Sequence, residues 1–146
     1  MPLIDEVAGV AAVRMRPLIL IVEDQSELRQ LYVQQLVMSG FDVIEASDGE
    51  GAIERTSSQF PDVVLMDLSL PVIDGWEATR RLKSDARTAH IPVVALTAHD
   101  GSGELQRATD AGCDWFVPKP CPPDALITEV RRVLDKGPSK LGPCAT

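Results

Sequence analysis

The chain has 146 residues, which is enough for one domain with a single core and too few for a second domain of ordinary size. Its 22 acidic and 14 basic residues give a formal net charge of -8, which argues against a protein that neutralises nucleic-acid phosphates. No apolar run approaches the roughly 20 residues of a membrane span, and Asp5 and Glu6 stand where a secretory signal would be positive. We therefore expect a cytoplasmic protein that binds neither membrane nor nucleic acid directly.

The first half of the chain predicts two strands, each followed by a helix. Residues 1–16 are weakly patterned and are expected to be a dispensable N-terminal extension. The apolar run at 18–22 is typical of a parallel strand covered on both faces, and 41–46 alternates as a shorter strand. The intervening helix ends at Ser39-Gly40, and its apolar stripe is formed by Leu28, Leu31 and Leu36. Asp48 can cap the second helix, which Phe60-Pro61 stops.

The second half continues the alternation. Apolar runs at 63–66, 93–96 and 115–118 predict three more strands. Asp74-Gly75 turns the chain into a helix that carries Trp76, a fourth helix covers 104–111, and Pro122-Pro123 suits the start of the last helix. Residues 136–146 are expected to be a flexible tail, which leaves 17–135 as the folded domain. Five strand–helix units with right-handed crossovers give a three-layer α/β sandwich around a parallel sheet.

The three cysteines lack C-x-x-C spacing and are odd in number, so neither a disulfide framework nor a zinc site is expected. Cys113 is expected to pack as a small hydrophobe. Cys121 follows Lys119-Pro120, and its role stays open. Trp115 is open as well, because it could cover an edge strand or mark a partner surface.

Four of the predicted strands run directly into functional polar groups. The first runs into Glu23-Asp24, the third into Asp67, the fourth into Thr97 and the fifth into Lys119. Ligands of parallel α/β sheets bind beyond the carboxyl ends of the strands. Three carboxylates, one hydroxyl and one ammonium are therefore expected to converge on one crevice.

The chemistry of this set is that of phosphoryl transfer. Clustered carboxylates need a compensating cation, and a few oxygen ligands with bound water suit Mg²⁺ (or Mn²⁺) better than Ca²⁺. Lys119 adds a positive charge, Thr97 can bond an oxyanion, and Asp67 is the best candidate for an in-line nucleophile. A single strand-end Asp is more often a cap or turn residue, but four strands ending in this way favour a site.

These residues lie in motifs that resemble the receiver domains of two-component response regulators, of the single-domain, CheY-like type. The motifs are Val22-Glu23-Asp24, Asp67 to Gly75, Leu96-Thr97-Ala98 and Val117-Pro118-Lys119-Pro120. The resemblance covers 17–135 and implies a doubly wound five-stranded sheet in the flavodoxin-like order 2-1-3-4-5. It implies that Asp67 accepts a phosphoryl group from a sensor histidine kinase or a histidine phosphotransfer protein.

The resemblance also implies roles for the neighbouring residues. Asp24, Asp67 and the backbone carbonyl of Ser69 would bind Mg²⁺, and Glu23 would act through bound water. Thr97 and Lys119 would contact the phosphoryl oxygens, and the Lys119-Pro120 peptide bond would be cis. Phe116 occupies the position of the family's aromatic switch residue, although it could simply pack. Ser69 and His99 resemble positions that tune loss of the phosphoryl group, or are ordinary exposed loop residues.

The implied function is a signalling phosphoacceptor that catalyses only its own Mg-dependent phosphorylation and dephosphorylation. Phosphorylation would reshape the face made by the fourth helix, fifth strand and fifth helix for a downstream protein partner. No output domain is expected after residue 136. One alternative is a phosphorylation-independent interaction module, which would be expected to have lost part of the acidic set. A phosphatase with an Asp nucleophile is another, but that chemistry requires a second Asp where Ser69 stands.

Overall fold

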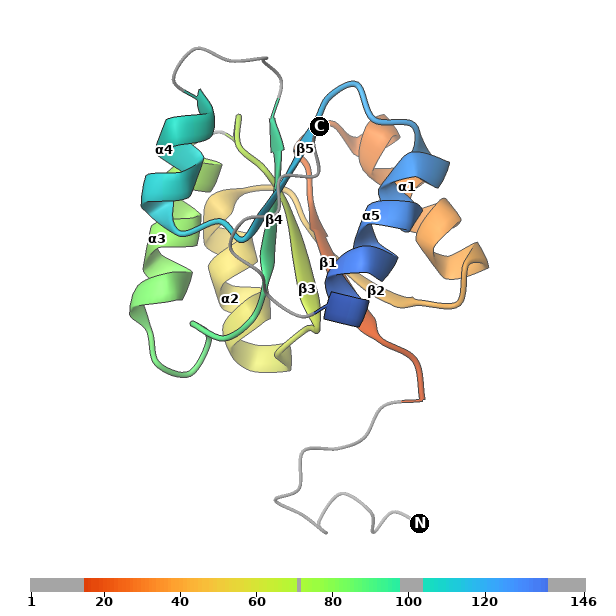
Figure 1. Ribbon diagram of the computed structural model, residues 1–146, viewed down its shortest axis with the longest axis horizontal. Helices are drawn as coiled ribbons and strands as arrows, with labels where there is room; N and C mark the ends of the chain where they lie inside the picture. The colour runs from red at the N-terminus through yellow and green to blue at the C-terminus, as the bar shows by residue number, and fades with distance from the viewer. Residues whose placement is uncertain (1–14, 71, 98–103, 137–146) are drawn as a thin grey trace, which may run out of the picture.

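The computed structural model of the protein describes residues 15–70, 72–97 and 104–136. Strands and helices alternate along the chain, as the sequence predicts (Figure 1). The strands are β1 (Leu18–Val22), β2 (Asp42–Ala46), β3 (Val63–Asp67), β4 (Val93–Thr97) and β5 (Trp115–Pro118). The helices are α1 (Ser26–Met38), α2 (Gly49–Gln59), α3 (Gly75–Ser84), α4 (Glu104–Ala111) and α5 (Pro123–Lys136). The parts of the two predicted end segments at 1–14 and 137–146 lie outside the described residues.

The five strands form one parallel sheet in the order β2-β1-β3-β4-β5. This confirms the predicted doubly wound topology. Strands β3 and β4 are buried over all five residues, which explains their continuous apolar runs. Strand β2 lies at an edge and is mostly half-buried, which explains its alternating pattern.

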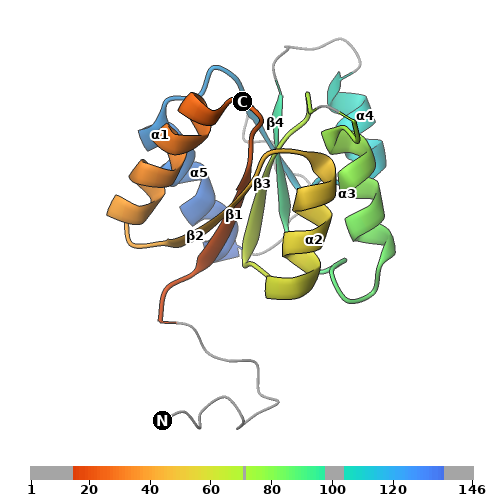
Figure 2. The ribbon, with the colours of Figure 1, turned by 180° about the vertical axis from the view of Figure 1, so that it is seen from behind.

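Helices cover both faces of the sheet, so the molecule has three layers. Helices α1 and α5 lie on one face and α2, α3 and α4 on the other (Figures 1 and 2). The side chains of β3 alternate between two core clusters: Val63 and Leu65 pack toward α1 and α5, whereas Val64 and Met66 pack toward α2 and α3. The sheet therefore separates two apolar cores.

The predicted helix cap at Asp48 is present, and Asp74, predicted only to turn the chain into a helix, caps one as well. The side chain of Asp48 accepts a hydrogen bond from Gly51 N–H (2.8 Å) at the start of α2. The side chain of Asp74 accepts one from Glu77 N–H (2.9 Å) at the start of α3. Each bond satisfies a backbone donor that the helix itself leaves without a partner.

The predicted apolar stripe of α1 is wrong at one residue. Leu31 is 53% exposed, and the buried side chains of this helix are Tyr32 and Leu36. Tyr32 lies four residues from both Leu28 and Leu36, so it falls on their face of the helix. Its polar tip can be buried there because the hydroxyl donates to Cys121 O (3.0 Å).

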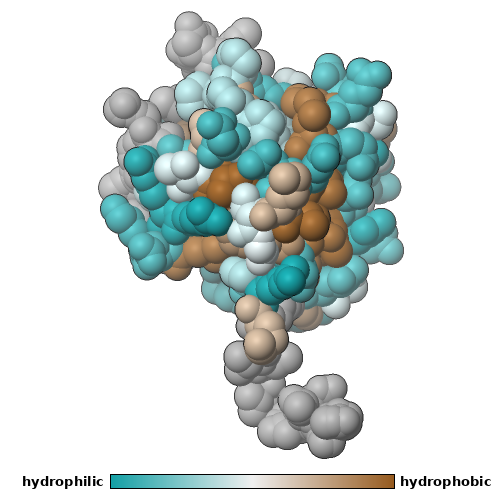
Figure 3. Space-filling view, turned by 90° about the vertical axis from the view of Figure 1, so that its right-hand side faces the viewer, coloured by the Kyte–Doolittle hydropathy of each residue, from teal (hydrophilic) through white to brown (hydrophobic). Residues whose placement is uncertain are grey.

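Leu31 is one of several apolar side chains that α1 exposes. Val37 and Met38 are also exposed on this helix. Figure 3 faces α1 and α5 and shows apolar side chains gathered in patches near the middle of this side of the molecule, with polar side chains around them. Within the described residues, no helix has both the length and the apolar character that crossing a bilayer would require.

Two residues named from the sequence have structural roles away from the crevice. Cys113 is 8% exposed and packs in the core, and burial raises the pKa of its thiol to about 12, as expected for a small hydrophobe. Trp115 is buried on edge strand β5, and its indole N–H donates to Glu129 on α5 (3.0 Å). Trp115 therefore covers the edge strand.

Candidate functional site

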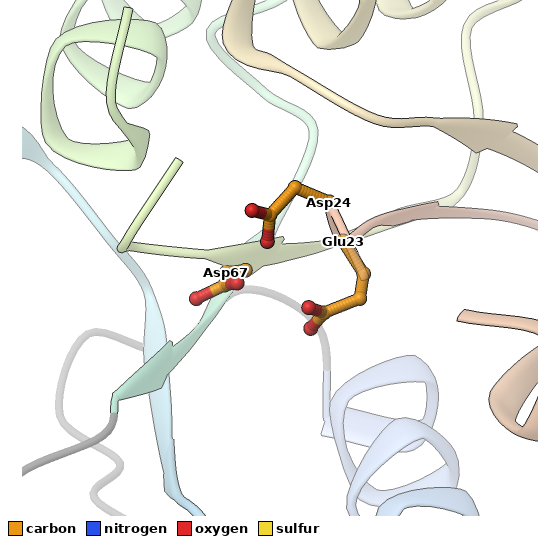
Figure 4. Close-up of side chains that lie close together, drawn as sticks. All are labelled: Glu23, Asp24 and Asp67. Atoms are coloured by element: carbon orange, nitrogen blue, oxygen red, sulfur yellow. The ribbon is translucent and has the colours of Figure 1, made fainter. Parts of the chain in front are cut away.

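The acidic residues meet at the carboxyl edge of the sheet. Glu23 and Asp24 directly follow β1, and Asp67 is the last residue of the neighbouring strand β3. Figure 4 shows the three side chains pointing toward one another from these two strand ends. One carboxylate oxygen from each residue lies within 4.8 Å of the others. The predicted convergence of the three carboxylates is therefore present.

Asp67 is held in place by both its side chain and its backbone. The residue is only 2% exposed, and its Oδ1 accepts a hydrogen bond from Ser69 N–H (3.0 Å). Gly75 at the start of α3 packs against its main chain, since a Cβ there would lie 2.4 Å from Asp67 O. Only glycine allows this close approach. The start of α3 therefore packs directly against the end of β3.

Lys119 joins the acidic groups across the crevice. Its Nζ lies 3.3 Å from Glu23 Oε1 and 3.4 Å from Asp67 Oδ1. Its backbone N–H donates to Thr97 O (2.7 Å), which ties the end of β4 to this residue. The Lys119-Pro120 peptide bond is cis.

Burial and mutual repulsion shape the protonation of the cluster. Burial raises the pKa of Asp67, Asp24 adds to this effect, and the Ser69 N–H and Lys119 oppose it. Burial also raises the pKa of Glu23, together with the charge of Asp67, while Lys119 and the Gln25 N–H lower it. When all groups are ionised, three carboxylates face one ammonium, which leaves two negative charges for a cation to balance.

The donor set fits a divalent hard cation. The three carboxylates offer only oxygen ligands, and Asp24 is exposed, so a bound ion could keep part of its water shell. Mg²⁺ and Mn²⁺ favour such partly hydrated carboxylate sites. Among the described residues, this is the one group of three or more His, Cys, Asp or Glu side chains close enough to share a metal.

The remaining predicted residues lie around this cluster. Thr97 is buried at the end of β4 (4% exposed), and Ser69 is exposed beside Asp67. Phe116 on β5 is half-buried and packs against the core beneath α2 and α3. His99 lies outside the described residues. The structure thus brings Glu23, Asp24, Asp67 and Lys119 into one cluster, with Thr97 bonded to Lys119 through its backbone.

Cys121 lies beside the crevice. It lines a hollow of about 280 Å³ together with Lys119, Tyr32 and Leu28. Burial raises the pKa of its thiol to about 11. Because the thiolate is the reactive form, Cys121 is a poor nucleophile at neutral pH.

Arg29 contacts the site but was not predicted from the sequence. This residue of α1 donates from Nη1 to Glu23 O (2.8 Å) and from Nε to Glu45 Oε1 (2.9 Å). Arg29 and Leu36 are seven residues apart, so they lie on the same face of the helix. A charged residue on the inner face of α1 was the signal that could have identified it.

Comparisons with known proteins agree on one family. The family described as "Response regulator receiver domain" matches residues 19–131. The polar-differentiation response regulator DivK of Brucella ovis is 33% identical over 116 residues, which cover 80% of this chain and 94% of that protein. The phosphate regulon transcriptional regulatory protein PhoB of Klebsiella pneumoniae is 34% identical over 116 residues, or 80% of this chain. The matched region spans about half (51%) of PhoB.

Solved structures show the same architecture. The chemotaxis response regulator CheY4 of Vibrio cholerae superposes with a TM-score of 0.78 at 26% identity, over 82% of this chain and 100% of that one. The receiver domain of a signal transduction histidine kinase from Syntrophus aciditrophicus gives a TM-score of 0.76 at 30% identity, over 82% and 91%. The chain belongs to the response regulator receiver domain family of two-component systems, in which phosphorylation on an aspartate and Mg²⁺ binding are typical.

Proposed function

We propose that this receiver takes part in a phosphorelay in which Asp67 accepts a phosphoryl group from a sensor histidine kinase or a histidine phosphotransfer protein. The main support is the position of Asp67, a buried carboxylate at the end of the central strand with Lys119 Nζ 3.4 Å from its Oδ1. We assign the function to residues 17–135, in the cytoplasm, with the N-terminal extension dispensable for phosphorylation.

The acid cluster is proposed to hold Mg²⁺ or Mn²⁺. Asp24, Asp67 and the Ser69 backbone carbonyl would bind the ion directly, and Glu23 would act through a bound water. When bound, the ion supplies positive charge for the phosphoryl oxygens during transfer. The two negative charges left over in the cluster support a divalent ion over a monovalent one.

In the transfer step, a carboxylate oxygen of Asp67 attacks phosphorus in line with the leaving group. An O–P bond forms to Asp67 while the P–N bond to the donor histidine breaks, and the electron pair of that bond returns to the imidazole. The Lys119 ammonium neutralises charge on the transferring oxygens. The chain thus catalyses only its own phosphorylation and its later hydrolysis.

The response is proposed to be a two-state switch. The Thr97 hydroxyl turns toward a phosphoryl oxygen, and Phe116 moves into the space that Thr97 leaves. Thr97 and Phe116 lie within or beside the core, so a change in their positions would also displace the side chains packed around them. The face of α4, β5 and α5 then changes for a protein partner.

Incubating the full chain with acetyl phosphate and MgCl₂, and resolving phosphoprotein by intact mass, tests the central step. We expect an adduct that is stable in acid and labile to base and hydroxylamine, and that EDTA and Asp67→Asn abolish. Asp42→Asn is the matched control, because Asp42 is an exposed carboxylate on β2. Absence of the adduct in the wild type, or its survival in Asp67→Asn, would contradict the proposal.

A further inference from the structure

Arg29 connects three separate parts of the structure near the acid cluster. It lies in the first turn of α1, and its guanidinium reaches back to the turn that follows β1. Nη1 donates to Glu23 O (2.8 Å), and Nε donates to Glu45 Oε1 on strand β2 (2.9 Å). The side chain is 16% exposed, so these bonds are largely shielded from water.

The partners of Arg29 are themselves held. Glu45 Oε1 also accepts from Gln30 Nε2 (3.0 Å), and the backbone N–H of Arg29 donates to Gln25 O (2.9 Å). A planar guanidinium that is bonded at two points has little rotational freedom. Arg29 therefore acts as a rigid brace between the edge strand, the helix and the turn.

Glu23 is fixed at every polar group by its neighbours. Its N–H donates to Ala46 O (3.1 Å), and its carbonyl accepts from Arg29. One carboxylate oxygen accepts from Gln25 N–H (3.2 Å), and the other from Lys119 Nζ (3.3 Å). Of these four contacts, only the one from Arg29 acts on the carbonyl that leads into Asp24.

That carbonyl belongs to the peptide plane that Glu23 shares with Asp24. Because the peptide bond is planar, fixing the Glu23 oxygen also fixes the nitrogen and Cα of Asp24. Asp24 is exposed, so its surroundings restrain its side chain less than they restrain Glu23. The direction of its carboxylate then depends on how firmly this plane is held.

We propose that Arg29 is a positioning residue for the metal site, and that it aims the Asp24 carboxylate by holding the Glu23-Asp24 peptide plane. The inference rests on the proposed function, since it assumes that the acid cluster binds a divalent cation. Arg29 itself touches neither the ion nor the phosphoryl group in this scheme.

A positioning role and a purely electrostatic role of Arg29 predict opposite changes in Mg²⁺ affinity when the residue is replaced. Arg29 is a cation near the cluster, so deleting its charge reduces electrostatic repulsion of Mg²⁺ and should tighten binding. If Arg29 instead positions Asp24, deleting it should weaken binding. Removal of residues that orient metal ligands lowers affinity by about tenfold or more, which exceeds the effect of one partly neutralised charge near the surface.

The experiment measures Mg²⁺ affinity directly by isothermal titration calorimetry on the full chain. We expect Arg29→Met to raise the Kd about tenfold. Arg29→Lys should raise it severalfold, because a lysine keeps the charge but cannot reproduce the two-point fork. Arg55→Met is the matched control: Arg55 lines the same surface hollow of about 500 Å³ as Arg29, but it lies on α2 and takes no part in the four hydrogen bonds of Glu23 described above. It should leave the Kd unchanged.

The outcomes separate the inference from the proposed function. If wild type binds Mg²⁺ and both Arg29 variants bind it equally well or more tightly, the positioning role is wrong and the metal site stands. If Arg29→Met fails to fold, Arg29→Lys decides, and a wild-type Kd in that variant overturns the inference. If wild type itself takes up no Mg²⁺, the proposed metal site fails, and the inference fails with it.

Discussion

Val72 carries the clearest local strain at the scale of single residues. It has a φ of +63° and is 92% exposed, five positions after Asp67. A β-branched residue is rare in the left-handed region, and that conformation costs an L-residue roughly 1–2 kcal/mol. Asparagine tolerates it far better. We therefore expect Val72→Asn to increase the free energy of unfolding by about 1 kcal/mol, as measured by urea denaturation.

Val72→Thr is the matched control for this substitution. Threonine has nearly the same shape as valine and keeps the branched Cβ, so it should retain the strain and gain little stability. Equal gains in the two variants would show that polarity at this exposed site, and not the backbone, sets the stability.

The raised pKa of Asp67 predicts a pH dependence of stability in the absence of metal. Burial raises the pKa above the ordinary 3.8, so the folded state holds the proton more tightly than the unfolded chain does. Stability from this group is complete below pH 3.8 and is lost as the pH rises through the folded-state pKa. At neutral pH, Asp67→Asn should therefore be more stable than wild type, by the order of 1 kcal/mol.

Urea unfolding in EDTA across this pH range measures the effect. The stability difference between Asp67→Asn and wild type should shrink as the pH is lowered through the folded-state pKa of Asp67, because the wild-type carboxyl then becomes protonated. A difference that grows on acidification, or a variant less stable than wild type at neutral pH, would contradict the assignment of a destabilising buried charge.

At the scale of elements, an ion pair fastens α3 to the sheet at the end opposite the acid cluster. Lys83 Nζ lies 2.7 Å from Asp114 Oδ2 and also donates to Ile91 O (2.8 Å). Asp114 Oδ2 accepts from Val93 N–H at the start of β4 (2.9 Å). Asp114→Ala would leave a mostly buried ammonium and a backbone donor without this partner. We expect a loss of about 3 kcal/mol in the free energy of unfolding.

The exposed pair Arg87–Asp85 provides the comparison. It lies just beyond the C-terminal end of α3, with an Nη2 to Oδ2 distance of 3.0 Å. Arg87→Ala should cause no measurable loss in the free energy of unfolding, because water screens exposed ion pairs and replaces their contacts. Similar losses in Asp114→Ala and Arg87→Ala would show that burial of the Lys83 pair does not matter.

The elements were predictable where one physical rule controls them. Strands β3 and β4 are buried on both faces and so read as unbroken apolar runs, and Asp48 and Asp74 cap helices through local hydrogen bonds. Helix α1 was harder, because its inner face carries Tyr32 and Arg29 where a simple pattern expects aliphatic residues. The Tyr32 hydroxyl and Nη1 of Arg29 both donate to backbone carbonyls, which no side-chain pattern in the sequence reveals.

The candidate site followed from the same logic. In a parallel sheet the strand ends share one edge, so Glu23, Asp67 and Lys119 could be placed together from sequence. The hydrogen bonds that hold these groups in place could not be predicted from the sequence. The contacts from Arg29 to Glu23 O and from Lys119 N–H to Thr97 O depend on how helices and loops settle on the sheet.

At the scale of the whole molecule, the negative charge gathered at the acid cluster links ion binding there to the stability of the folded state. The chain has a net charge of -8, and three of its carboxylates are gathered at one edge of the sheet with a single lysine. Folding brings these like charges together, which opposes folding in the absence of a cation. In the unfolded chain Asp24 and Asp67 are 43 positions apart, so no equivalent site exists. Any ion that binds the cluster must therefore favour the folded state.

We accordingly expect MgCl₂ to stabilise the chain more than NaCl of equal ionic strength. Above the Kd, each tenfold increase in free Mg²⁺ should add about 1.4 kcal/mol to the free energy of unfolding, because the ion binds only the folded state. NaCl should give only general screening of the surface charge. Thermal unfolding over a series of Mg²⁺ concentrations, with Asp24→Asn as the control, measures this difference. Asp24 is exposed, so its neutral variant should fold normally and lose the Mg²⁺-specific increase. Equal stabilisation by the two salts would show that the acid cluster responds to ionic strength alone.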